Sequence, residues 1–98
     1  MQVTVKAIDF DATAKLEEFI QKKVVKLEQY SDEITSVDIS LKVVKPEIAE
    51  NKEVLIKVLV PNSELVATKV ADTFEEAFDH AMDALIRQII KTKEKARS

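Results

Sequence analysis

The chain has 98 residues, of which 46% are hydrophobic and 34% charged, and its net charge of −3 fits a single soluble domain with one modest core. It contains no glycine, which excludes a glycine-rich phosphate loop, and no cysteine, which excludes disulfides, thiolate metal sites and cysteine nucleophiles. It also lacks both a membrane-spanning apolar run and the pattern of a signal peptide, so we expect a cytoplasmic protein.

The first half of the chain predicts a strand, a helix and a second strand. Residues 2–8 alternate apolar and polar side chains, as a half-buried strand does. A helix is predicted over about residues 13–29, where either Asp11 or Thr13 can cap the start. Residues 35–44 alternate again and give the clearest strand. The helix residues expected to face the core are Leu16, Phe19, Ile20, Val24 and Leu27.

The second half predicts two more strands and a long helix. After a polar loop at residues 45–52, residues 53–60 are apolar on both faces, as expected of a central strand. Turn residues then lead into a strand at 64–71. Asp72 begins the last helix in this interpretation, because Glu75 three residues later completes the pattern of a capping box. The residues spaced for the buried side of this helix are Phe74, Phe78, Met82, Leu85 and Ile89.

The order of these elements, βαβββα, predicts an α+β two-layer sandwich. The first two strands flank a helix, so we expect them to be parallel and joined by a right-handed crossover. The other strands form an antiparallel meander, and both helices cover one face of a four-stranded mixed sheet. We expect one domain over residues 1–95, with a frayed C-terminus at 96–98. Which sheet face is covered stays open, because residues 53–60 are apolar on both sides.

The last predicted helix is divided by charge. Residues 72–83 include five acids and neither lysine nor arginine, whereas residues 87–98 include five bases and one acid. The final twelve residues therefore carry +4 and the first 86 carry −7, which together give −3. Like charges four residues apart, as at Arg87 and Lys91, repel each other, so the basic cluster suggests a negatively charged partner. The alternatives are a solvated surface or a disordered, solubilising tail.

The first helix adds further bases near its end, although nearby glutamates dilute the signal. If both helices lie on one side of the sheet, their basic ends could flank one groove. Only Tyr30, at the end of the first helix, is placed to stack on a base.

Catalytic groups are scarce. His80 is the single histidine, and we expect it to be a surface residue because no serine or cysteine forms a nucleophile motif with it. Glu75, Asp79 and Asp83 share one helix face and could hold a hydrated Mg²⁺ weakly, but a solvated face that complements the helix dipole is favoured. We therefore expect no enzyme activity, no cofactor and no small-molecule substrate.

Three segments together resemble a known family. They are the Thr-led helix ending in Lys-x-x-Lys-Leu-Glu-x-aromatic (residues 11–30), the strand at 34–43, and the strand and capped helix ending in Arg-Gln-aliphatic-x-Lys (66–95). They resemble the short ribosome hibernation promoting factors, also called ribosome-associated inhibitors or ribosomal subunit interface proteins. The resemblance covers nearly the whole chain, in order.

The resemblance implies a fold likened to double-stranded RNA-binding domains and binding to the small ribosomal subunit, in the channel used by mRNA and tRNA. Translation would be blocked in slow growth or stress, by occlusion and without chemistry. The family's basic positions match Lys23, Lys26, Arg87, Lys91 and Lys95 here, and charge and location add Lys22 and Lys93. These seven residues form the expected RNA-binding set.

The chain also departs from the family's pattern. Ala7 and Ile8 stand where the family often has glycine or a base, which puts an RNA contact from that turn in doubt, and Ile86 replaces a frequent acid. The chain resembles the short form, and the resemblance leaves open whether it promotes ribosome dimers or silences single ribosomes.

Two other functions are compatible with the residues. One is a general module for structured RNA, which would use the same bases. The other is a protein-interaction or homo-oligomerising domain, in which Leu55 and Leu59, or Val66 and Val70, are exposed on the outer face of the sheet.

Overall fold

The computed structural model of the chain describes residues 1–44, 50–61 and 63–97, with side chains as far as Thr92. The predicted βαβββα order is confirmed, and the elements follow the expected ranges closely. They are strand β1 (Gln2–Ile8), helix α1 (Ala14–Val24), the 3₁₀ helix η1 (Val25–Gln29), strands β2 (Ser36–Val43), β3 (Lys52–Val60) and β4 (Ser63–Ala71), and helix α2 (Phe74–Arg97).

The strands form one four-stranded sheet in the order β1-β2-β3-β4. β1 is parallel to β2, with Val3 opposite Val37, and the other neighbours are antiparallel. Ile56 of β3 lies opposite Ile39 of β2 on one side and Ala67 of β4 on the other. The predicted mixed sheet, with a parallel pair followed by an antiparallel meander, is therefore confirmed.

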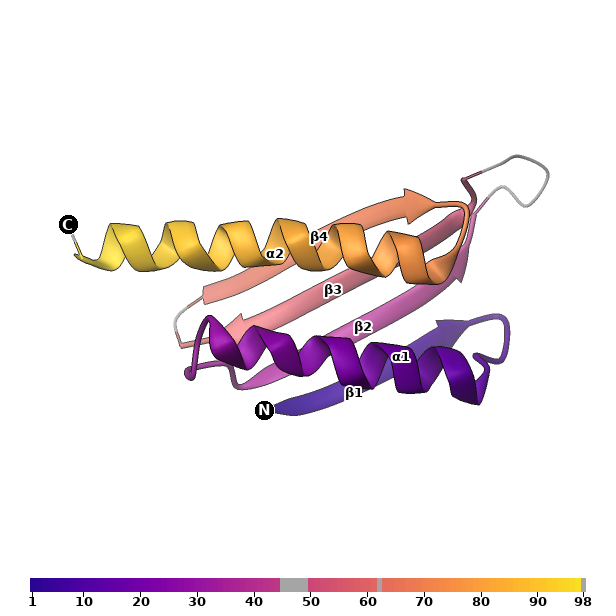
Figure 1. Ribbon diagram of the computed structural model, residues 1–98, viewed down its shortest axis with the longest axis horizontal. Coiled ribbons are helices and arrows are strands. Elements are labelled where there is room, and N and C mark those ends of the chain that lie inside the picture. Colours follow the sequence, from indigo (N-terminus) through magenta and orange to yellow (C-terminus); the bar gives the residue numbers. More distant parts are fainter. Residues whose placement is uncertain (45–49, 62, 98) are drawn as a thin grey trace.

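Both helices lie on the same face of this sheet (Figure 1). That face carries the fully buried side chains of β2 and β3, among them Val37, Ile56 and Val58. Leu55 and Leu59 point to the other face and are half-buried. The register thus answers what the sequence left open, because the even-numbered residues of β3 face the helices.

The core joins the two helices to the sheet. The residues that helical spacing predicted to be buried in α2 are all buried, and in α1 and η1 only Phe19 is partly exposed. The Phe19 ring meets Phe78 edge-on, with centroids 6.1 Å apart. Phe10, from the loop before α1, stacks on Phe74 at 5.1 Å. Full burial of a side chain such as Phe78 contributes about 1.5–3 kcal/mol, so this helix–helix contact anchors the layer.

The helix ends differ in detail from the prediction. Thr13 caps α1, accepting a hydrogen bond from the Leu16 N–H at 3.1 Å, and the helix tightens to 3₁₀ geometry after Val24. The expected start of α2 at Asp72 is wrong, because Thr73 accepts the N–H of Glu76 at 3.1 Å. The Asp72 carboxylate instead accepts the backbone N–H of Glu50 at 2.7 Å, which occupies it outside the helix.

The helices run in the same direction, so their C-terminal ends lie at the same end of the molecule (Figure 1). α2 extends past the end of the sheet there. Its backbone is helical as far as Arg97. The expected fraying at residues 96–98 stays a prediction, and Ser98 lies outside the described residues. No helix in the described part of the chain is long and apolar enough to cross a membrane.

Candidate nucleic-acid interface

The end of α1 and the 3₁₀ turn after it carry the first basic group. Lys22 and Lys23 lie in the last turn of α1, and Lys26 lies in η1. All three are exposed, because Ile20 and Val24 direct the buried stripe of the helix toward the sheet. Cations at a helix C-terminus are favoured by the helix dipole, so this placement needs no partner to be stable.

Two of these lysines already have acidic neighbours. The Nζ atom of Lys22 lies 3.8 Å from Glu18, one turn earlier, and both side chains are well exposed. The Nζ atom of Lys23 lies 3.9 Å from Asp79 of α2 and 5.3 Å from the centroid of the Phe19 ring. Exposed pairs of this kind are worth about 0–1 kcal/mol, so a phosphate can displace them at small cost.

The basic half of α2 is different, because its described cations are unpaired. Arg87 and Lys91 are exposed, and no described carboxylate lies within ion-pair distance of either one. Lys93 and Lys95, which the sequence also placed in the RNA-binding set, lie beyond the described side chains. Lys26 of η1 is likewise unpaired among the described residues.

Whether the two basic helix ends flank one groove stays a prediction, because the end of α2 lies beyond the described side chains. Asp79 faces α1, because its carboxylate meets Lys23. Successive helical residues are about 100° apart around the axis, so Arg87 lies about 80° and Lys91 about 120° away from Asp79. Both therefore turn away from α1 and toward the edge strand β4. The two basic groups share one end of the layer but occupy different sides of α2.

On that side, Arg87 lines a hollow of about 190 Å³ with Lys69 of β4, and with His80, Asp83 and Ala84 of α2. The sequence argument missed Lys69. In the register of β4 it belongs to the row that faces the helices, together with the buried Ala67 and Ala71, yet it is exposed. A charged residue at an inward position of the terminal strand was the available signal, because such residues mark sheet edges.

Two further hollows lie on the described part of the molecule, one beside this surface and one at the opposite edge of the sheet. One, of about 380 Å³, lies on α2 and is lined by Arg87, Gln88, Ile90 and Lys91.

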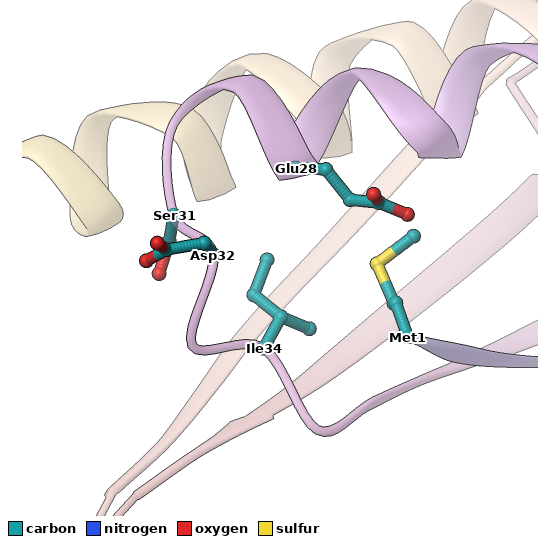
Figure 2. A pocket seen from close by; sticks show the side chains of 5 residues that line it. All are labelled: Met1, Glu28, Ser31, Asp32 and Ile34. Carbon is teal, nitrogen blue, oxygen red and sulfur yellow. The ribbon is translucent and has the colours of Figure 1, made fainter.

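The other hollow, of about 120 Å³, lies between the start of β1 and the turn after η1 (Figure 2). It is lined by Met1, Glu28, Ser31, Asp32 and Ile34. Because it carries two carboxylates and neither lysine nor arginine, it is electrostatically unsuited to an anion.

The acidic half of α2 holds the histidine and the carboxylates that the sequence analysis considered for catalysis and metal binding. Nε2 of His80 lies 3.6 Å from Glu76, and both side chains are more than half exposed. No group of three or more histidines, cysteines or acids lies close enough to hold a metal within the described ranges. Asp79 is paired with Lys23, and Asp83 lines the hollow with Lys69 and Arg87.

The outer face of the sheet carries both pairs of apolar residues considered for protein contacts. Val66 and Val70 are 41% and 43% exposed, whereas Leu55 and Leu59 are half-buried. Charged residues interrupt this surface, including an ion pair of 3.7 Å between Lys57 and Glu64. The apolar side chains are therefore spread among polar ones.

Comparison with known proteins agrees with this fold. The chain matches the family model described as Sigma 54 modulation protein / S30EA ribosomal protein over residues 3–97. It is similar to the ribosome hibernation promoting factor of Azotobacter vinelandii, with 34% identity over 95 residues that cover 97% of this chain and 85% of that protein. The factor of the same name from Escherichia coli strain K12 is 32% identical over 97 residues, covering 99% and 98%.

Solved structures give the same picture. A ribosomal subunit interface protein from Coxiella burnetii has a TM-score of 0.86 at 26% identity, and the match covers 96% of this chain and 99% of that one. The N-terminal domain of Protein Y from Thermus thermophilus has a TM-score of 0.78 at 19% identity, over 94% and 99% of the two chains. The second likeness bears on the fold alone.

Proposed function

Because this chain belongs to the Sigma 54 modulation protein / S30EA ribosomal protein family, we propose that it is a ribosome hibernation factor of the cytoplasm. It binds the small ribosomal subunit, occludes the channel used by mRNA and tRNA, and so inhibits translation in slow growth or stress. The observation that supports this proposal is the pair of exposed cations, Arg87 and Lys91, which have no acidic partner among the described side chains of the regular helix α2.

The mechanism is electrostatic docking without chemistry. The guanidinium of Arg87 can bind a phosphate through two parallel hydrogen bonds, while the lysines act as point charges. Each neutralised phosphate releases counterions, so affinity falls as salt rises. The first 86 residues carry −7, which limits binding to arbitrary RNA and favours a site of matching shape.

Occlusion follows from the shape of the helix layer. The 24 residues of α2 span about 36 Å at 1.5 Å per residue. The far end of α2 extends past the sheet (Figure 1), which presents its basic half to a partner from more than one side. Ile89, two residues after Arg87, is buried in the core and holds this part of α2 in place, so the protein fills space that a nucleic acid would otherwise occupy.

The test is sedimentation of the protein with ribosomes through a density gradient, at low and moderate salt. The variant Arg87→Gln/Lys91→Gln removes two charges from α2. Its matched control, Lys6→Gln/Lys42→Gln, removes two exposed charges from the opposite face of the sheet. We expect the wild type and the control to co-migrate with the small subunit or the whole ribosome, and the α2 variant to bind at least about tenfold more weakly.

The outcomes separate the alternatives. Wild-type protein left at the top of the gradient at both salts defeats the proposal. Equal binding by the two double variants shows that α2 is the wrong surface. A general module for structured RNA would bind naked duplex RNA as tightly as ribosomes. A shift of ribosomes into dimers identifies a factor that pairs them, and its absence identifies one that silences single ribosomes.

A further inference from the structure

Lys69 is an unusual residue for its place in the sheet. β4 is an edge strand, and Lys69 lies opposite Val54 in the row of β4 that faces the helices. Ala67 and Ala71 in that row are buried, whereas Lys69 is exposed and reaches the hollow between β4 and α2. A lysine at an inward position protects the edge of a sheet, and its place beside α2 also gives it access to a ligand.

The hollow brings Lys69 of strand β4 together with Arg87 of helix α2, the next element of the chain. Asp83 also lines the hollow, but neither cation has a carboxylate within ion-pair distance among the described side chains. His80, the remaining ionisable group, is directed to Glu76 at 3.6 Å. Two cations from different elements thus share one cavity with a single carboxylate, and neither forms an ion pair with a described residue.

A hydrogen bond fixes the two elements relative to each other. The side-chain amide of Gln88, next to Arg87, donates to the backbone carbonyl of Val66 at 3.0 Å. Val66 lies in β4, on the same strand as Lys69. Because the bond ties α2 to the edge of the sheet at this point, the separation of Arg87 and Lys69 is set by the fold and not by a flexible loop.

We propose that Lys69 and Arg87 form a phosphate-binding subsite between β4 and α2 that takes a phosphodiester group of the RNA backbone. The subsite extends the interface from the helices onto the edge of the sheet. That the RNA is ribosomal rests on the proposed function. The hollow of about 190 Å³ admits a phosphate with part of its hydration shell, because one water requires only roughly 10–15 Å³ in the same measure.

Asp83 gives the subsite its selectivity. A carboxylate in the same hollow weakens binding of a free anion, so inorganic phosphate alone binds poorly. A phosphodiester that is also held by Lys91 and the rest of the interface overcomes this repulsion. The subsite therefore favours a phosphate that belongs to a longer strand.

The test is a double-mutant cycle on affinity for purified small ribosomal subunits, measured at several potassium chloride concentrations. The variants are Lys69→Gln, Arg87→Gln and the two combined, with Lys42→Gln on the opposite sheet face as the control. We expect Lys69→Gln to weaken binding about fivefold or more and to lower the salt slope by about 0.7–0.9, as loss of one phosphate contact does. The combined variant should lose less than the product of the single effects, because both residues hold one phosphate.

Each outcome bears on the proposal. If Arg87→Gln weakens binding while Lys69→Gln behaves like Lys42→Gln, the subsite is overturned and the proposed function stands. If the wild type does not bind subunits at all, the proposed function is overturned, and the same cycle on a naked RNA duplex decides the subsite. Binding to the duplex that is weakened by Lys69→Gln supports the subsite, and unchanged or absent binding overturns it. Circular dichroism melting of each variant confirms that the fold is intact.

Discussion

The Nζ atom of Lys23 lies 3.9 Å from Oδ1 of Asp79, so an ion pair links the basic end of α1 to the acidic half of α2. Lys23 is therefore paired with another residue of the protein, while Arg87 and Lys91 form no ion pair among the described side chains. In the proposed interface RNA competes with Asp79 for Lys23, and this competition lowers the affinity gained at that position.

Asp79→Asn should consequently strengthen binding to RNA. The change releases Lys23 and removes one negative charge from the interface. Because an exposed ion pair is worth at most about 1 kcal/mol, the gain in affinity should not exceed about fivefold. It should appear with naked duplex RNA as well as with ribosomes, because Lys23 is released for either ligand. Fluorescence anisotropy with both ligands measures the two affinities.

The control for this prediction is Asp38→Asn. Asp38 is exposed on the outer face of the sheet, so its replacement changes the net charge equally without touching Lys23. Equal gains from the two variants would show that total charge, and not the pairing with Lys23, limits binding.

Thr73→Ala should destabilise the protein by about 1 kcal/mol, because it removes the hydroxyl that accepts the Glu76 N–H at the start of α2. For a domain of this size, that loss lowers the melting temperature by about 4–8 °C. Thr73→Ser keeps the hydroxyl and should melt close to the wild type. The melting temperatures of the three proteins are measured by calorimetry. A Thr73→Ala variant with the melting temperature of the wild type would indicate that Asp72, and not Thr73, caps α2.

The cap of α2 also shows where sequence reasoning ends. Asp72 and Thr73 are both good capping residues, and local pattern cannot choose between them. The choice is made by the N–H of Glu50, which reaches the Asp72 carboxylate from 22 positions earlier. The strands and the buried stripe of α2 were predictable because they depend on local periodicity, and the pairing of the strands followed from the rules for their connections.

The surface was less predictable for the same reason. The family resemblance is confirmed, and the basic clusters of α1 and α2 are visible in the sequence. The roles of these lysines and Arg87 stay predictions. Their grouping depends on how far α2 is rotated against its neighbours, which places Arg87 beside Lys69 and not beside Lys23. The sequence argument took its bases from the two helices alone and so missed Lys69.

Gln88→Ala should loosen the edge of the sheet. The Gln88 amide donates to the Val66 carbonyl at 3.0 Å, and without it this carbonyl on the free edge of β4 is open to another strand. We expect a loss of about 0.5–1.5 kcal/mol in urea unfolding. We also expect concentration-dependent self-association in sedimentation velocity.

Gln21→Ala, at an exposed position of α1, is the control and should change neither result. A Gln88→Ala variant that stays monomeric and fully stable would mean that the bond does not protect the edge.

Asp9→Gly should stabilise the protein, although glycine usually does the opposite. Asp9 follows β1 with φ of 63°, in the left-handed region, and the chain has no glycine to place there. A side chain with Cβ is strained in this region, less so for aspartate than for most residues, whereas glycine adopts it freely. We expect a net gain below about 1 kcal/mol, because glycine also loses more entropy on folding. Asp9→Ala, which keeps Cβ but loses the polar side chain, should be less stable than the wild type.

Asp11→Gly tests glycine at a nearby position without positive φ and should cost about 0.5–1 kcal/mol. Chemical denaturation of the four proteins should therefore rank Asp9→Gly above the wild type and both other variants below it. Equal losses for Asp9→Gly and Asp11→Gly would show that the turn after β1 is not strained.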